Sequence, residues 1–128
     1  MKNIFLLLLF VLSFIQCKTR GNLVLNETQS CAGSELPQEL KNRNGGAGLL
    51  EKSWDKHGTL VLQTYFFAIC EGTTISGNKF VHHHKITISY SEDIRGEPSK
   101  CRCPKLYTHH LKGLDRNKEY EIEVIELD

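Results

Sequence analysis

Strict alternation of apolar and polar residues marks two segments of the chain, residues 85–91 and residues 119–125. Successive side chains of a β-strand point to opposite faces of its sheet, so each segment is predicted to be a strand with one buried and one exposed face. Glu121 and Glu123 would then face solvent. The residues predicted to face inward are Ile86, Ile88, Tyr90, Tyr120, Ile122 and Val124.

A continuous apolar run covers residues 59–70, which are rich in β-branched and aromatic side chains. This composition is typical of a strand in the middle of a sheet. Residues 105–111 form a further strand candidate, and a polar turn at residues 112–118 separates it from the last strand. Several short strands joined by turns of Gly, Asn and Asp indicate an all-β fold, an antiparallel β-sandwich with an immunoglobulin-like outline.

The first half of the mature chain has a weaker pattern. Polar residues dominate positions 18–44, and Pro37 limits any helix around residues 34–40. The glycine-rich residues 44–48 are predicted to form a turn. We therefore expect three parts: a signal peptide at 1–16, a lipid-anchored tether and loosely structured segment at 17–44, and a β-sandwich domain at 45–128.

The amino terminus has the pattern of a secretion signal. Lys2 supplies a positive charge, and an apolar core follows over residues 4–15. A membrane-spanning helix needs about 18 or more apolar residues, and this run ends before that length. We therefore predict an exported protein.

Residues 12–17 resemble the lipobox of Gram-negative bacterial lipoproteins, with Ile15 and Gln16 in place of the usual small residues. The resemblance implies that Cys17 carries a diacylglyceryl group and acyl chains such as palmitate. The membrane is then a partner through this lipid anchor, and the expected location is the cell envelope, on the periplasmic or surface face of the outer membrane. The alternative is an ordinary secretory signal that is cleaved near Cys17.

Five cysteines are an odd number for an exported protein, but four remain if Cys17 is the anchor. These four can form two disulfides in three pairings, and an oxidising envelope would preserve them. Cys101 and Cys103 are separated by one residue, which places them near the upper limit of bridging distance on a strand. We therefore expect one of them to pair with Cys70 and the other with Cys31.

The second half of the chain, from Thr59 onward, resembles a β-sandwich domain of small Gram-negative lipoproteins whose function is unknown. The resemblance implies a sandwich and transfers no catalytic residue. It is carried by Cys70 at the end of a strand, the Cys101-Arg102-Cys103 sequence, and a closing hairpin with Gly113, Leu114, Tyr120 and Val124.

The charge balance argues against a nucleic-acid partner. The chain has 16 basic and 15 acidic residues, and removal of the leader with Lys2 leaves 15 of each. Nucleic-acid binding favours a basic surface. The sequence also has no Gly-x-Ser-x-Gly, His-Glu-x-x-His or Cys-x-x-Cys pattern. We therefore predict a non-enzymatic structural or interaction module without a cofactor, whose partner is a protein or a glycan.

Histidines supply the one alternative chemistry. His82 and His84 would share a face of a strand, and His109 or His110 could add a third imidazole. Imidazoles suit zinc, copper and nickel, so the alternative function is that of a metal-binding lipoprotein. The competing interpretation is a polar hairpin rim with exposed imidazoles.

Overall fold

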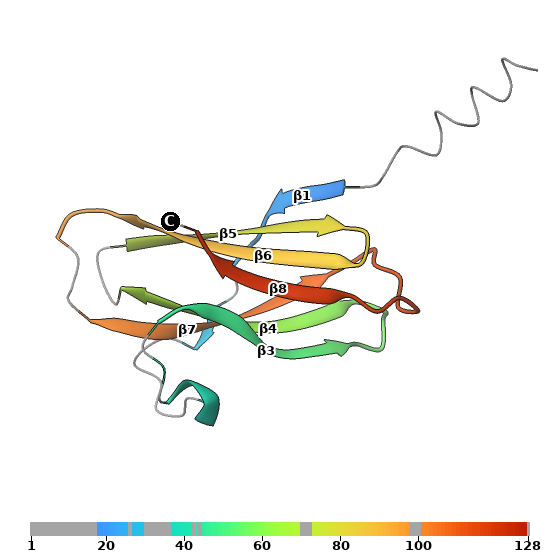
Figure 1. Cartoon of the computed structure of the whole chain (residues 1–128), viewed down its shortest axis with the longest axis horizontal. Helices are drawn as coiled ribbons and strands as arrows, with labels where there is room; N and C mark the ends of the chain where they lie inside the picture. The colour runs from blue at the N-terminus through green and yellow to red at the C-terminus, as the bar shows by residue number, and fades with distance from the viewer. Residues whose placement is uncertain are drawn as a thin grey trace, which may run out of the picture.

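The computed structural model describes residues 18–25, 27–29, 37–41, 43, 45–69, 73–97 and 101–127. Within these residues the strands form two packed sheets, which confirms the predicted all-β sandwich (Figure 1). The elements are β1 (Lys18–Asn22), β2 (Glu27–Gln29), the 3-10 helix η1 (Gln38–Leu40), β3 (Ala47–Trp54), β4 (Leu60–Ile69), β5 (Thr73–His82), β6 (Lys85–Ile94), β7 (Arg102–Leu111) and β8 (Glu121–Glu126).

One sheet has the strand order β1-β5-β6-β8, and the other has the order β2-β7-β4-β3. The strand pairs are antiparallel with one exception, because β8 runs parallel to β6. Parallel neighbours need a crossover connection, and here the chain reaches β8 only after passing through β7 in the opposite sheet. The expectation of a wholly antiparallel sandwich is therefore wrong for this pair.

The strands with strong sequence patterns were predicted correctly. The apolar run became β4, which lies between β7 and β3, and the two alternating segments became β6 and β8. Ile86, Ile88 and Tyr90 are fully buried, and Tyr120 is 6% exposed. The predicted inward and outward faces of β8 are also confirmed: Ile122 and Val124 pack against the core, whereas Glu121 and Glu123 are exposed.

Four strands, β1, β2, β3 and β5, were not predicted because the sequence patterns of their segments are weak. The expected tether begins with β1, which pairs along its whole length with β5, and Leu23 and Leu25 pack against the core. An edge strand gains its stability from backbone hydrogen bonds, so a polar sequence suffices. The glycine-rich segment forms a turn only up to Gly46, whose φ is 88°, and β3 begins at the next residue, Ala47. The sandwich thus includes described residues well before position 45.

β5 was not predicted because Gly77 lies in the middle of the strand and interrupts its pattern. A Cβ atom at this position would lie 2.7 Å from Leu25 Cδ2 and 3.4 Å from the Tyr90 ring. Glycine usually weakens a strand, but here it allows two neighbouring side chains to approach the backbone. The residue that resembles a strand breaker in the sequence is therefore a packing requirement.

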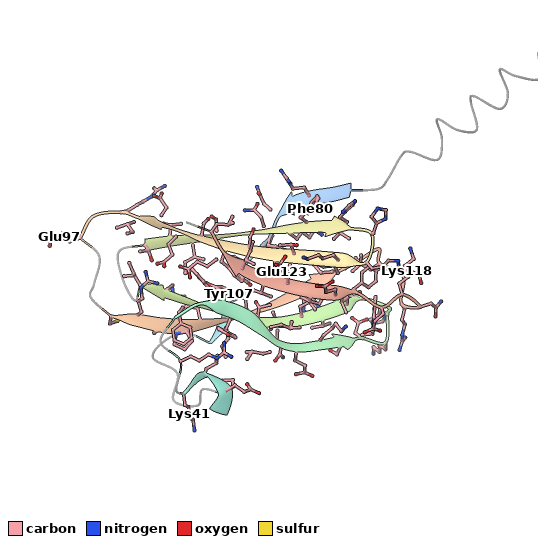
Figure 2. All side chains as sticks on the ribbon, viewed as in Figure 1. Lys41, Phe80, Glu97, Tyr107, Lys118 and Glu123 are labelled. Atoms are coloured by element: carbon pink, nitrogen blue, oxygen red, sulfur yellow. The ribbon has the colours of Figure 1, made fainter. Side chains whose placement is uncertain are left out.

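The core fills the space between the two sheets, and Figure 2 shows the side chains there, including the labelled Tyr107. A smaller cluster lies on the outer face of the second sheet, where Leu40 of η1 covers Tyr65 and Phe67. The predicted helical segment is therefore only the three-residue η1 within the described chain, and it caps this cluster. No helical segment in the described part of the chain is suited to crossing a bilayer.

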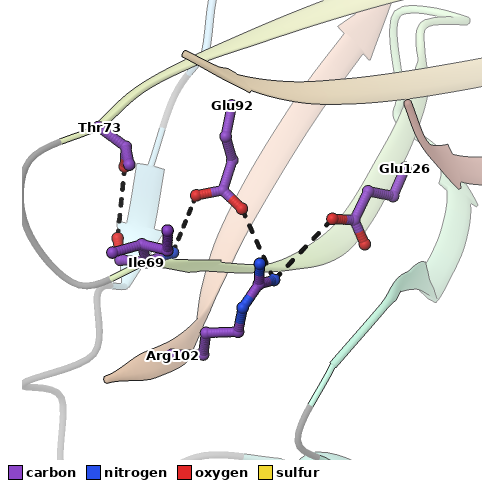
Figure 3. Close-up of polar contacts among 5 residues, drawn as sticks. All are labelled: Ile69, Thr73, Glu92, Arg102 and Glu126. Carbon is purple, nitrogen blue, oxygen red and sulfur yellow. Dashed lines mark hydrogen bonds and ion pairs between the residues drawn. The ribbon is translucent and has the colours of Figure 1, made fainter. Parts of the chain in front are cut away.

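Ion pairs connect the sheets at one end of the sandwich (Figure 3). Arg102 on β7 lies 3.7 Å from a Glu92 oxygen on β6 and 3.9 Å from a Glu126 oxygen on β8. The Glu92 side chain is only 10% exposed, and its second oxygen accepts a 2.9 Å hydrogen bond from the Ile69 backbone N–H. A nearly buried carboxylate is tolerated because both of its oxygens have partners.

Cys101 and Cys103 are both disulfide-bonded, and no disulfide joins two of the described cysteines to each other. Cys17, Cys31 and Cys70 lie outside the described residues, so the pairing with Cys31 and Cys70 stays a prediction. The β4–β7 register ends with Ile69 opposite Arg102, and in the sequence Cys70 follows Ile69 while Cys101 precedes Arg102. The described part of β4 therefore ends one residue before Cys70, and β7 begins one residue after Cys101.

Candidate functional site

A groove of about 470 Å³ lies on the outer face of the β1-β5-β6-β8 sheet. We call it the outer groove. It is formed by residues of β5, β6 and β8, by Leu127 just after β8, and by Arg20 of β1. Its lining residues are Arg20, Asn78, Lys79, Phe80, Thr87, Ser89, Ile125 and Leu127.

The outer groove follows from the strand pattern of the sheet. On β6 the large side chains point into the core, so the outward positions carry the small hydroxyl residues Thr87 and Ser89. The neighbouring strands place the larger side chains of Phe80 and Ile125 on either side of this row. Small residues on a central strand between larger residues on its neighbours create a hollow across the sheet.

Arg20 and Phe80 form a cation–π contact in the groove. They are directly opposite each other in the β1–β5 register, and the guanidinium carbon of Arg20 lies 5.1 Å from the centre of the Phe80 ring. The Phe80 ring also stacks on His82, at 6.1 Å between centroids and an interplanar angle of 24°. A cation–π contact at an exposed site contributes about 0.5–1 kcal/mol. The Phe80 ring, labelled in Figure 2, thus supports the Arg20 guanidinium and its hydrogen-bond donors.

The lining of the outer groove has a definite chemical character. Arg20 and Lys79 are cations, and none of the described lining residues is a carboxylate. Asn78 adds an amide, and Leu127 adds an apolar side chain that is 44% exposed. An arginine fork matches the geometry of a carboxylate. The groove therefore suits a partner that presents a carboxylate next to an apolar group.

A polar cluster of different character lies inside the core. The Tyr90 hydroxyl is 2.5 Å from Thr64 Oγ1 and 2.5 Å from His109 Nε2, and all three residues are buried. Burial raises the pKa of Tyr90 to about 12, although the hydrogen bond with Thr64 acts in the opposite direction. Burial, with a smaller effect from the nearby His110, lowers the pKa of His109 to about 4. The cluster is therefore neutral at pH 7.

The histidines considered as metal ligands are distributed over different environments. His109 faces the core and contacts Tyr90, whereas His110, the next residue of β7, is exposed. His84 is exposed in the turn between β5 and β6, next to the exposed His83, and His82 stacks on Phe80. Within the described chain, no group of three or more histidine, cysteine or acidic residues is arranged to hold a metal ion. The structure thus does not bring His82, His84, His109 and His110 together as a ligand set.

Sequence analysis did not identify the outer groove. Arg20 lies in a segment without a strand pattern, and Gly77 hid the strand that carries Phe80. The one available signal was the alternation of Asn78, Phe80 and His82 with their neighbours, which places these three side chains on one face of a strand.

No protein-family model, curated protein or solved structure matches this chain. The resemblance of the leader and of the cysteine spacing to small Gram-negative lipoproteins therefore stays a prediction.

The buried His109 predicts a specific loss of stability in acid. Its pKa is about 4 in the folded protein and about 6.5 in an unfolded chain, so the unfolded state binds more protons between these values. Stability should therefore fall as the pH decreases from about 6.5 to 4, with roughly 3 kcal/mol attributable to this group. Chemical denaturation across this range should show a flatter pH dependence for His109→Gln than for the unmodified protein. His84→Gln, in the exposed turn between β5 and β6, is the control. An unchanged profile in His109→Gln would contradict the assignment.

Proposed function

We propose that this protein is a non-enzymatic interaction module of the cell envelope, anchored through a lipid on Cys17, that binds its partner in the outer groove. The observation that carries the proposal is the exposed Arg20 guanidinium, which is supported by the Phe80 ring in a groove whose described lining residues include no carboxylate.

The chemistry of the groove favours an acidic segment of a partner protein. A carboxylate can accept two parallel hydrogen bonds from the Arg20 guanidinium, and Lys79 adds a second positive charge. Ile125 and Leu127 lie in the same groove and suit an apolar side chain beside that carboxylate. A glycan with acidic sugars offers the same charge without comparable apolar groups, so an acidic peptide segment is the better fit.

The position of β1 supports a location close to the membrane. β1 begins at Lys18, the residue after the proposed anchor Cys17, and Arg20 is only two residues further along. An acylated Cys17 would therefore connect to the folded sheet without an intervening flexible segment. The outer groove would lie near the bilayer surface, where neighbouring envelope proteins are accessible.

The lipid anchor predicts a change in location for a single variant. Replacement of the Cys17 thiol by a hydroxyl removes the acylation site, so Cys17→Ser should move the protein from the membrane fraction to the soluble fraction. Cell fractionation and mass spectrometry of the released protein measure this change. Retention of Cys17→Ser with the membranes, or an unmodified thiol at Cys17 in the native protein, would contradict the anchor.

The outer groove predicts selective binding of acidic, apolar peptides. In an NMR titration with the capped peptide Leu-Glu-Leu-Glu, the backbone amides of β5 and β6 beside the groove should shift. Arg20→Ala should weaken this binding by about tenfold because it removes a charge-assisted hydrogen bond.

Arg116→Ala, in the exposed turn before β8, is the matched control and should leave the affinity unchanged. A parallel titration with oligoglucuronate tests the glycan alternative. Stronger binding of the oligoglucuronate would overturn the peptide assignment, and the absence of shifts at the groove with both probes would overturn the site.

A further inference from the structure

The second half of β7 has an open edge. On one side, β4 pairs with β7 from Leu60 opposite Leu111 to Ile69 opposite Arg102. On the other side, β2 pairs with β7 only at Tyr107 and Leu106. Within the described residues, no strand pairs with this other side of residues 108–111. We call these four residues the β7 edge.

The β7 edge presents main-chain hydrogen-bonding groups. In an antiparallel pair, the N–H and C=O groups of one residue point to the same side, and consecutive residues alternate. Two of the four residues therefore direct their N–H and C=O groups away from β4. Among the backbone hydrogen bonds of the described loops, none ends on the β7 edge. A strand placed there would find unused donors and acceptors.

A groove of about 210 Å³ lies beside this edge. Its opposite wall is formed by Lys79 and residues 22–24, the segment in which the chain crosses from β1 toward β2. The Leu23 N–H in this segment donates a 2.8 Å hydrogen bond to the Gly77 carbonyl of β5. The crossing segment is therefore bonded to the first sheet, and it does not pair with the β7 edge.

Two of the other sheet edges, β3 and β1, carry features that discourage strand addition. β3 has a register irregularity between Leu49 and Glu51, and Lys52 of β3 forms a 3.0 Å ion pair with Glu119, two residues before β8. β1 contains Lys18 and Arg20 within five residues. Bulges and charged residues are common protections of exposed edges, and the β7 edge has neither a bulge nor a residue of the Lys, Arg, Asp or Glu type.

The walls of this groove indicate the chemistry of an occupant. Val24 is 81% exposed and offers an apolar contact, whereas Lys79 and the exposed His110 favour a negative charge. His109 also lines the groove, is only 2% exposed, and has no hydrogen-bond partner for Nδ1 among the described residues. None of the lining residues that the structure describes is acidic.

We propose that the β7 edge binds an extended acidic segment of another protein as an added strand in line with β2. The edge of four residues spans roughly 13 Å at about 3.3 Å per residue, so the paired part of the segment is about four residues long. Main-chain hydrogen bonds would provide affinity, and the apolar and positive walls would provide selectivity. This site shares Lys79 with the outer groove but is built on a different strand, β7, and it does not require the lipid anchor.

A selection experiment tests this proposal on the purified protein. A phage-displayed library of random decapeptides is selected against the protein, and the enriched sequences are synthesised. We expect apolar residues that alternate with acidic ones, and slower amide hydrogen exchange at residues 108–111 in the complex. Methylation of alternate peptide nitrogens should lower the affinity at least tenfold, because it removes the strand hydrogen bonds.

Two exposed positions serve as matched variants. Val24→Asp should weaken binding of the selected peptides about tenfold by charge repulsion, whereas Leu127→Asp, in the outer groove, should leave it unchanged. The proposal is overturned if no peptide is enriched, if N-methylated peptides bind equally well, or if hydrogen exchange slows elsewhere. Peptides that are sensitive to Leu127→Asp but not to Val24→Asp would assign binding to the outer groove and remove the β7 edge as a site.

Discussion

Tyr90 couples the two sheets through the core. It extends from β6 into the core, where its ring stacks on Phe66 of β4 at 5.4 Å and on Tyr107 of β7 at 5.2 Å. Its hydroxyl contacts Thr64 and His109 of the opposite sheet, and a fully buried polar group must keep such partners or cost about 1–3 kcal/mol. Ring packing alone would tolerate a small slide of one sheet over the other, whereas these hydrogen bonds fix their relative position.

Both proposed binding surfaces depend on this arrangement. Because Tyr90 and Ile88 face the core, Ser89 and Thr87 must face outward, and these small residues form the floor of the outer groove. Because His109 is bound to Tyr90 in the core, the β7 edge is held beside residues 22–24. The packing of Tyr90 and His109 in the core thus determines the shape of both surfaces.

The sequence predicted the strands whose stability comes from side chains. β4, β6, β7 and β8 have apolar runs or clear alternation, and the buried faces predicted for β6 and β8 were identified correctly. β1 and β2 were not predicted because an edge strand is held by backbone pairing, which leaves no side-chain pattern. β5 was missed because Gly77 serves a three-dimensional contact with Leu25 and Tyr90 that no local pattern reveals. The outer groove was missed with it, because Phe80 lies on β5.

The histidine cluster shows the limit of composition as evidence for a site. His82, His83 and His84 are adjacent in the sequence, but His83 and His84 belong to an exposed turn, which matches the hairpin rim considered as the alternative. His109 and His110 are also adjacent, yet strand alternation sends one into the core and the other toward solvent.

The stability of Tyr90→Phe is the most direct test of the coupling between the sheets. This variant keeps the stacked ring and removes only the hydroxyl, so Thr64 and His109 lose their common partner. We expect urea denaturation to show a loss of about 1–3 kcal/mol. Addition of Thr64→Val to Tyr90→Phe should cost less than the sum of the two single changes. Unchanged stability in Tyr90→Phe, or strict additivity in the double variant, would contradict the account.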